Sequence, residues 1–305
     1  MKELGHTYEI YGMIWRIWTM DGRKEQGRAQ LVSLLKKTIP PNFIDLVPHR
    51  WWRIGDITIV SIPSELEAYK QAIGKALLVV EQRARTILGK TGPTEGVIRK
   101  PQFEYLAGDP NTETIHKELG CRFKLDAAKI TFSPGNHGER TRLVNITKPG
   151  EIIIDLFACV GNLSLPLAVN NAPKRIVAAE INPLAFRYLN ENIRLNKVME
   201  KMTALLGDNR IILKDYEGMA DRVLSGFLES DEKQRRIAIR LCKKGGVLHY
   251  HESTPSATRE KRERPIRRLQ KHAKEEGREI SHIKKRTVKK YAPGVEHVVI
   301  DAIIR

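Results

Sequence analysis

The residues best suited to chemistry are two carboxylates, each of which ends an apolar run in a short stretch of the chain. Asp155 follows Glu151-Ile-Ile-Ile, and Glu180 ends a second apolar run after a Gly-containing turn and an amphipathic segment. This succession of strand, helix and strand is typical of a βαβ unit. An acidic residue at the tip of the second strand can accept hydrogen bonds from two ribose hydroxyls. The pattern therefore favours a nucleoside site over a purely structural buried unit.

The turn after the first strand limits the kind of nucleoside. Residues 155–162 read Asp-Leu-Phe-Ala-Cys-Val-Gly-Asn and lack the G-x-G-x-x-G spacing that suits a pyrophosphate. Gly161 and Asn162 are therefore predicted to line a pocket for an adenosine that carries no phosphate. S-adenosylmethionine, acting as a group-donating co-substrate, is the obvious candidate.

Two further loops are expected at the same edge of the sheet, because parallel strands place their carboxyl ends together. Asp208 and Asn209 follow the apolar run 203–206, and their carboxylate and amide suit an adenine amine and ring nitrogen. Residues 225–230 form the other loop. Taken alone, Asp208-Asn209 is also an ordinary turn and Asn182-Pro183 an ordinary helix start. Four loops after four successive strands favour function.

A polar segment before the first strand of this sheet supplies two more candidates. It runs from Ser133 to Arg142 and is predicted to be a loop that folds over the methionine end of the cofactor. Arg140 is expected to bind the cofactor carboxylate through two hydrogen bonds, worth roughly 1.5–3 kcal/mol when desolvated. The alternative is an exposed basic loop.

Charge indicates a polyanionic partner. The 305 residues have a net charge of +17, and residues 258–291 hold fourteen Lys or Arg against five Glu. Solubility alone is the alternative explanation, but a surplus this large is typical of nucleic-acid binding. A membrane surface is less favoured, because the basic helix expected near 262–274 has no broad apolar face. The sequence therefore predicts a nucleic-acid partner and no membrane partner.

Other features exclude several classes. No run of about 18 apolar residues occurs, so no membrane span is expected. The first twelve residues lack the apolar core of a signal peptide. Cys121, Cys159 and Cys242 are scattered without CxxC spacing, which argues against a disulfide framework and a zinc site. We expect a cytoplasmic monomer without a metal.

The hydrophobic pattern predicts an α/β fold, namely a doubly wound, mostly parallel Rossmann-like sheet of the class I S-adenosylmethionine-dependent transferase type. A smaller α+β N-terminal domain is expected before it. The predicted strands are 151–156, 175–180, 203–207, 221–227, 246–252, 279–288 and 295–304, and the predicted helices are 163–171, 183–195, 230–243 and 257–276. The last two strands are expected to form a hairpin, with the final strand antiparallel.

The domain boundaries are expected at residues 48 and 116. They delimit an N-terminal extension of unknown role (1–48), a small domain (49–116) that assists placement of the nucleic-acid partner, and a catalytic domain (117–305). Upstream elements include strands near 8–15, 55–62 and 97–108, two short strands in 123–132, and a helix over 65–81 with Ser64 as its N-cap.

Several motifs resemble a known family. They are Gly55-Asp-Ile-Thr-Ile, Pro63-x-Glu-Leu-x-x-Tyr69, residues 112–121, residues 133–142, Asp155-Leu-Phe-Ala, and Glu191-Asn-Ile-x-Leu-Asn-Lys-Val198. From residue 49 onward the chain resembles the wyosine-pathway branch of a tRNA modification family that also contains the tRNA guanine-37 N1-methyltransferases. Gly226-Phe-Leu-Glu-Ser230 is similar to the Gly-Leu-Leu-Pro-Ser of the aminocarboxypropyl transferases, and Gly245 to Glu252 also resembles that branch. The methyltransferases typically have Asn-Leu-Pro after the fourth strand.

This resemblance implies transfer of the 3-amino-3-carboxypropyl group of S-adenosylmethionine to carbon 7 of 4-demethylwyosine, at position 37 of phenylalanine tRNA. It implies cofactor contacts at Ser133, Arg140, Glu180, Asp208 and Asn209. Glu229 departs from the family proline, which leaves the orientation of the cofactor side chain open. The alternatives are a guanine-37 N1-methyltransferase and a tRNA-binding protein without turnover.

The group that removes the ring proton is not identified by the sequence. His249, His251 and Glu252 lie at a predicted strand end and are candidates, although a histidine there is more often structural. Phe227 lies in a suitable loop to stack on a tricyclic base. The basic segments 259–274 and 284–290 are predicted to attract tRNA phosphates in a salt-dependent way.

Overall fold

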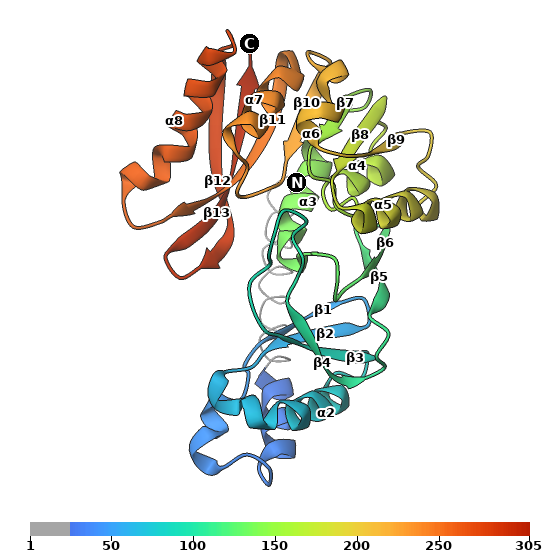
Figure 1. Cartoon of the computed structure of the whole chain (residues 1–305), viewed down its shortest axis with the longest axis vertical. Helices are drawn as coiled ribbons and strands as arrows, with labels where there is room; N and C mark the ends of the chain where they lie inside the picture. The colour runs from blue at the N-terminus through green and yellow to red at the C-terminus, as the bar shows by residue number, and fades with distance from the viewer. Residues whose placement is uncertain (1–24) are drawn as a thin grey trace, which may run out of the picture. The chain divides into compact units, whose positions relative to one another are not determined.

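The computed structural model describes residues 25–305, which divide into two compact units (Figure 1). The first contains the described residues up to Thr114 together with Asp126–Lys129. The second contains Ile115–Leu125 together with Ile130–Arg305. The strand predicted near 8–15 lies outside the described residues.

A seven-stranded sheet organises the second unit. Its strands are β7 (Ile152–Asp155), β8 (Arg175–Glu180), β9 (Met202–Leu206), β10 (Ala220–Ser225), β11 (Cys242–Pro255), β12 (Ile280–Ala292) and β13 (Val295–Ile304). The order is β12-β13-β11-β10-β7-β8-β9, and the five strands from β11 to β9 are parallel. β13 runs antiparallel to both of its neighbours. The predicted doubly wound sheet and its closing hairpin are therefore confirmed.

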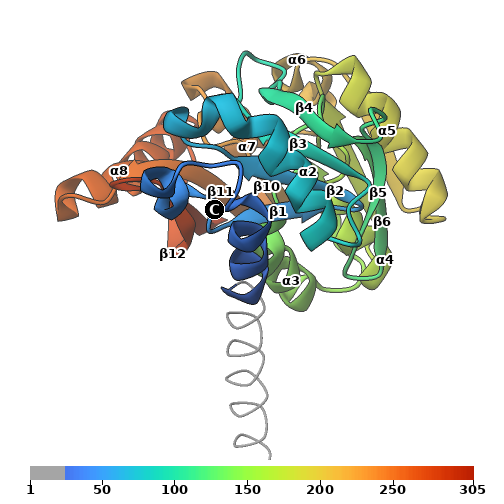
Figure 2. The ribbon, with the colours of Figure 1, turned by 90° about the horizontal axis from the view of Figure 1, so that it is seen from below.

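Most helices between the strands of this unit begin at a side-chain cap. The helices are α4 (Ser164–Asn170), α5 (Pro183–Leu195), α6 (Asn209–Ile212), α7 (Glu232–Leu241) and α8 (Arg259–Glu275). The Asn182 side chain accepts hydrogen bonds from the second and third residues of α5, and Asp231 forms a capping box with Gln234 at α7. Figure 2 shows α8 and α5 at opposite ends of the unit. α7 and α8 bury Ile237, Leu241 and Leu269 in the core of the sheet.

The segment before the sheet is more regular than expected. β5 (Glu113–Glu118) and β6 (Cys121–Asp126) form a two-stranded sheet, so only the first part of 123–132 is a strand. Residues 133–142 are not a loop: a short 3-10 helix, η3 (Pro134–Asn136), leads into helix α3 (His137–Ile146). The sequence did not reveal α3 because its charged residues Glu139 and Arg140 are buried, which removes the usual amphipathic pattern.

The first unit contains the sheet β1-β2-β3-β4 and the helix α2. Its elements are η1 (Pro41–Leu46), β1 (Trp51–Ile54), β2 (Ile57–Ser61), η2 (Ser64–Tyr69), α2 (Lys70–Val80), β3 (Thr86–Lys90) and β4 (Phe103–Gly108), after helical residues 25–35. The predicted boundary at residue 48 is wrong, because Leu31, Leu35 and Val47 belong to the same core as Ile73 and Leu106. The predicted helix 65–81 starts as 3-10 turns, and Ser64 bonds Glu65 instead of capping.

No helix within residues 25–305 combines the length and the apolar character that a membrane crossing requires.

Candidate active site

The candidate site lies at the carboxyl edge of the sheet, where the strand order reverses between β7 and β10. In open α/β sheets this is the usual place for a ligand. Backbone hydrogen bonds hold the predicted loops there: Leu156 N donates to Leu224 O (3.0 Å), and Ala158 N donates to Ala179 O (3.0 Å). Gly207 N donates to the carbonyl of Glu180 (2.9 Å). The structure therefore brings together the loops that follow β7, β8, β9 and β10.

Glu180 is anchored by the backbone on both sides. Cys159 N donates to its Oε2 and Asn182 N to its Oε1, each at 2.7 Å. Burial raises the pKa of Glu180, and these backbone hydrogen bonds oppose that effect. A carboxylate has about four acceptor sites, so capacity remains for ligand hydroxyls. The group is thus fixed in direction and suited to a ribose.

Asp155 lies beneath the same turn and is completely buried. Its Oδ1 accepts a hydrogen bond from Phe157 N at 3.2 Å, which shapes the first residues of the loop. Burial raises the pKa of Asp155 to about 6, although hydrogen bonding by Ser164 acts in the opposite direction. The predicted role of Asp155 in cofactor binding stays a prediction, and in the structure the carboxylate supports the turn from within.

Gly161 and Asn162 form the end of this turn. Gly161 has a φ of +93°, and a Cβ atom there would lie 2.8 Å from Cβ of Leu165. The Asn162 amide donates to the carbonyl of Thr131 (3.4 Å), while its Oδ1 is buried and has no hydrogen-bond partner among residues 25–305. A buried acceptor without a partner is unfavourable, so a ligand donor would complete this part of the site.

Gly161→Ala is expected to lower the free energy of unfolding by about 2–4 kcal/mol, because overpacking adds to backbone strain. Gly218→Ala is the matched control, since Gly218 has a φ of +73° but nothing within 4 Å of an added Cβ. Gly218→Ala therefore measures the effect of the backbone conformation alone and should lower the free energy of unfolding by roughly 1 kcal/mol. Urea denaturation followed by circular dichroism measures both. Equal losses in the two variants would contradict close packing at Gly161.

The loop after β9 divides its two polar residues between different tasks. Asp208 caps α6 and pairs with Arg210, whose Nη2 lies 2.5 Å from Asp208 Oδ2, and this hydrogen bonding lowers the pKa of Asp208. Asn209 donates to the carbonyl of Leu156 at 2.9 Å. Its Oδ1 is buried without a hydrogen-bond partner in the described chain. Asn209 therefore presents an acceptor for a ligand amine, while recognition by Asp208 stays a prediction.

Arg140 differs from the expectation. It is completely buried in α3, with Nε and Nη2 at 2.5 and 2.8 Å from the two carboxylate oxygens of Glu118. Nη2 also donates to the carbonyl of Ser133 at 3.1 Å, and the guanidinium lies over the ring of Phe132. The two hydrogen bonds that were expected with the cofactor carboxylate are thus made with Glu118, because a buried guanidinium requires a carboxylate. Only Nη1 has no partner among the described residues.

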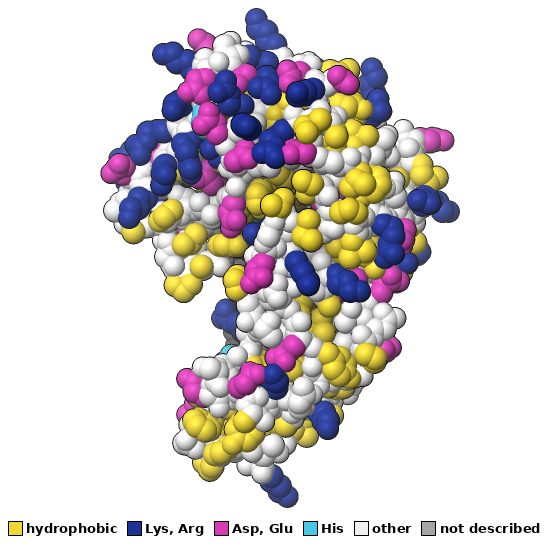
Figure 3. Space-filling model, viewed as in Figure 1, with side chains coloured by type: hydrophobic (Ala, Val, Ile, Leu, Met, Phe, Trp, Pro, Cys, Tyr) yellow, Lys and Arg dark blue, Asp and Glu magenta, His cyan; other side chains and the backbone are white. Residues whose placement is uncertain are grey.

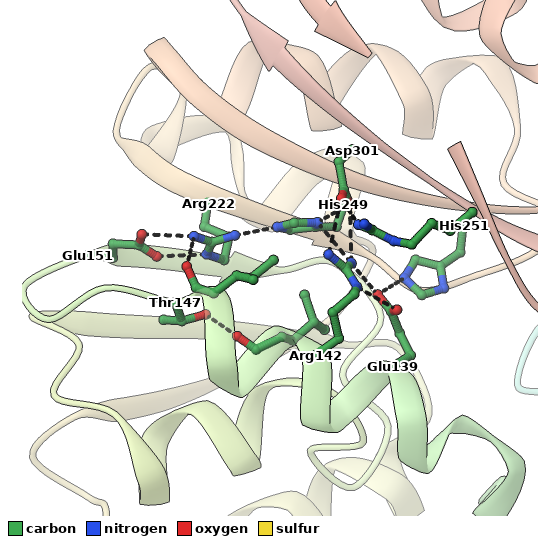
Figure 4. A network of polar contacts seen from close by, with 11 residues as sticks. Glu139, Arg142, Thr147, Glu151, Arg222, His249, His251 and Asp301 are labelled. Atoms are coloured by element: carbon green, nitrogen blue, oxygen red, sulfur yellow. Dashed lines mark hydrogen bonds and ion pairs between the residues drawn. The ribbon is translucent and has the colours of Figure 1, made fainter. Parts of the chain in front are cut away.

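His249 belongs to a polar network behind this edge (Figure 4). Its Nδ1 lies 2.6 Å from Oδ1 of Asp301, and its Nε2 accepts from Arg222, which pairs with Glu151 at 2.7 Å. Burial lowers the pKa of His249, so the ring is neutral, with the proton on Nδ1 donated to Asp301. Arg142 of α3 joins Asp301 to Glu139. Both ring nitrogens of His249 are occupied, as expected of a structural residue.

The two other candidates for the proton acceptor are also buried. Nδ1 of His251 lies 2.9 Å from Nε2 of His297, and burial lowers the pKa of each ring to about 3. Glu252 accepts from the hydroxyl of Tyr250 and pairs with Arg268 of α8. The structure therefore places all three candidates inside the fold, and the proton acceptor stays unassigned.

An aromatic pair was missed by the sequence. Phe157, after β7, packs against Phe227, after β10, with ring centroids 5.2 Å apart. The sequence signal that could have revealed Phe157 is its position two residues after Asp155, because residues that directly follow a strand at this edge lie next to the ligand. The pair offers apolar surface beside Asn209 and supports the predicted stacking role of Phe227.

These features fit an adenosine ligand. The carboxylate of Glu180 is fixed by two backbone hydrogen bonds and keeps acceptor capacity, the buried amide oxygens of Asn162 and Asn209 have no partner in the described chain, and Gly161 leaves no room for a side chain. With the sheet order, they define a class I S-adenosylmethionine-dependent transferase. Residues 114–281 match the TRM5/TYW2 methyltransferase domain, and residues 31–112 match the TYW2 N-terminal domain. The chain belongs to the TRM5/TYW2 family.

Pyrococcus horikoshii and Methanocaldococcus jannaschii have similar proteins. A tRNA(Phe) (4-demethylwyosine(37)-C(7)) aminocarboxypropyltransferase of Pyrococcus horikoshii is 38% identical over 90% of this chain and 96% of that protein. The enzyme of the same name from Methanocaldococcus jannaschii is 40% identical over 83% of this chain and 97% of that protein. The crystal structure of P. horikoshii TYW2 in complex with MeSAdo has a TM-score of 0.76 and 37% identity. It covers 91% of this chain and 98% of its own.

Proposed function

We propose that this protein transfers the 3-amino-3-carboxypropyl group of S-adenosylmethionine to carbon 7 of 4-demethylwyosine at position 37 of phenylalanine tRNA. The observation that supports this most strongly is the 38–40% identity to aminocarboxypropyltransferases across nearly their whole length. The Glu180 site adds a physical reason, since it suits an adenosine without a phosphate.

The chemistry depends on orientation. The sulfonium of the co-substrate activates its methyl, ribose 5′ and γ carbons alike, so the carbon that faces the nucleophile in line with sulfur decides the outcome. In the proposed reaction, carbon 7 of the base bonds the γ carbon while the bond between γ carbon and sulfur breaks. The sulfur takes the electron pair and leaves as methylthioadenosine, and the ring then loses its proton. Glu180 fixes the ribose, and Phe227 stacks on the acceptor base.

The tRNA side of the proposal rests on charge. α8 buries Pro265, Leu269 and Ala273 and exposes basic side chains, which gather over the region of α8 in Figure 3. The exposed residues are Arg259, Lys261, Arg262, Arg264, Arg267, Lys271 and Lys274. Such a row suits phosphates near the anticodon and gives salt-dependent affinity. The proposal includes a monomer, assistance by the N-terminal unit in placing the tRNA, and, because the substrate is a tRNA, a cytoplasmic location.

The by-product tests the reaction directly. Incubation with S-adenosylmethionine and phenylalanine tRNA from a strain lacking this protein should release methylthioadenosine, detected by mass spectrometry, in amounts equal to the modified base. An unmodified phenylalanine tRNA transcript is the control and should release none. S-adenosylhomocysteine in its place would show methyl transfer, and tRNA binding without either by-product would show a protein without turnover.

A further inference from the structure

Lys289 on β12 is a partly buried cation close to the predicted cofactor segment. Its Nζ donates a hydrogen bond to Oγ of Ser133 at 2.6 Å. Within residues 25–305, no carboxylate lies at ion-pair distance from this ammonium group. Burial and the positive charge of Arg140 lower the pKa of Lys289. An ammonium group that is largely removed from water and lacks a counter-ion is unfavourable, and an anion would stabilise it.

The path of this side chain is fixed by packing. A Cβ atom added at Gly135 would lie 3.3 Å from Nζ and 3.4 Å from Cδ of Lys289. Glycine at that position therefore leaves space for the lysine stem to reach the hydroxyl of Ser133. On the same strand, Lys290 is exposed. The two lysines are neighbours in sequence with different surroundings.

Lys289 lies near the loop that follows β7, because residues 131 and 133 form hydrogen bonds with that loop and with Lys289 respectively. The Ser133 hydroxyl accepts a hydrogen bond from Nζ of Lys289. Two residues earlier, the carbonyl of Thr131 accepts a hydrogen bond from Sγ of Cys159 at 3.4 Å. The backbone N–H of Cys159 in turn donates to Glu180. Ser133 and its lysine thus stand beside the turn that holds the predicted ribose ligand. A chain of atoms that extends from the ribose 5′ carbon toward residues 131–133 would approach both the Ser133 hydroxyl and the Lys289 ammonium group.

Other cations near this segment are already neutralised. Arg140 gives two nitrogens to Glu118, and Arg142 lies between Glu139 and Asp301. Lys289 is therefore the cation beside Ser133 whose charge is not balanced within the described chain. Its ammonium and the Ser133 hydroxyl form a pair of donors of the kind that binds a carboxylate.

We propose that Lys289, together with Ser133, binds the α-carboxylate of the aminocarboxypropyl arm and thereby orients that arm. This inference rests on the proposed function and names the residue that recognises the transferred group. Binding here fixes the far end of the arm while Glu180 fixes the ribose, so the γ carbon between them is held in one direction.

Affinities for three nucleosides test this assignment. Isothermal titration should be carried out with S-adenosylmethionine, its decarboxylated analogue and methylthioadenosine on the wild-type protein, on Lys289→Met and on the control Lys290→Met. Methionine keeps the length of the lysine stem without its charge. Lys289→Met should weaken S-adenosylmethionine binding roughly 10- to 100-fold and leave methylthioadenosine binding unchanged. Lys290→Met should leave both affinities unchanged.

The decarboxylated analogue identifies the group that Lys289 recognises. It should bind the wild-type protein more weakly than S-adenosylmethionine, and this preference should disappear in Lys289→Met. A preference that persists would overturn the assignment, as would equal losses for all three nucleosides. Loss of tRNA affinity with unchanged nucleoside affinities would assign Lys289 to a phosphate instead. If the wild-type protein binds none of the nucleosides, the proposed function itself fails.

Discussion

Replacing Glu180 by alanine should weaken S-adenosylmethionine binding and product formation by at least about 100-fold. A hydrogen bond to a charged group contributes about 1.5–3 kcal/mol, and in the proposed site the carboxylate accepts two from the ribose. The substitution also leaves the backbone N–H groups of Cys159 and Asn182 without the acceptor that holds the turn. Isothermal titration with methylthioadenosine measures the loss of affinity for the nucleoside part alone, so this result does not depend on binding of the aminocarboxypropyl arm.

Two controls separate binding from folding. Glu200→Ala removes an exposed carboxylate after α5 and should leave nucleoside affinity unchanged. Glu180→Gln keeps the side-chain volume and one acceptor, so it should retain the fold and lie between wild type and alanine in affinity. A tRNA affinity similar to wild type is expected in all three variants. Nucleoside affinity of Glu180→Ala within threefold of wild type would contradict the assignment of this site.

Asp301→Asn should lower the free energy of unfolding by about 3–5 kcal/mol near neutral pH, because it removes the carboxylate that pairs with Arg286 and one of the two that pair with Arg142. The Asp301 carboxylate on β13 accepts a hydrogen bond from Nδ1 of His249. It also forms ion pairs with Arg142 of α3 at 3.1 Å and with Arg286 of β12. One carboxylate thus joins three strands and a helix. Asparagine preserves its size and its hydrogen bond with His249, so the loss reports charge.

The same variant has a defined pH dependence. Burial alone would raise the pKa of Asp301, but the hydrogen bond with His249 and the charges of Arg142 and Arg286 hold it at about 2. A lowered pKa in the folded state means that the contribution is complete above about pH 4 and is lost as the pH falls toward 2. The difference between wild type and Asp301→Asn should therefore be constant from pH 7 to 5 and shrink between pH 4 and 2.

The measurement must follow the second unit. All four tryptophans lie at residues 15, 18, 51 and 52, so tryptophan fluorescence reports the N-terminal part of the chain. Circular dichroism during urea denaturation suits the seven-stranded unit better. Asp215→Asn, at an exposed carboxylate, is the control and should change stability by less than about 0.5 kcal/mol. A loss at Asp301 that does not vary between pH 7 and 3 would contradict the charge argument.

Local pattern was sufficient to locate part of the site. Asp155, Gly161 and Glu180 lie in one strand–turn–helix–strand sequence, and the periodicity of that segment places each of them at the carboxyl edge. Parallel strands connected by helices have few alternatives, so the sheet and its closing hairpin were also predictable. Asn209 follows from the same rule, since it comes directly after the next strand.

Only the tertiary structure decided which charges meet. Arg140 is separated from Glu118 by 22 positions and Lys289 from Ser133 by 156, and no periodicity connects either pair. The predicted loop 133–142 instead contains a 3-10 turn and the start of helix α3, because the fold buries the charged residues of α3 against partners from other elements. The free energy of a buried charge depends on partners brought close by folding rather than on neighbours in sequence. The sequence alone thus determined the sheet and the place of Glu180 at its carboxyl edge, and the three-dimensional structure determined that Lys289 lies beside Ser133.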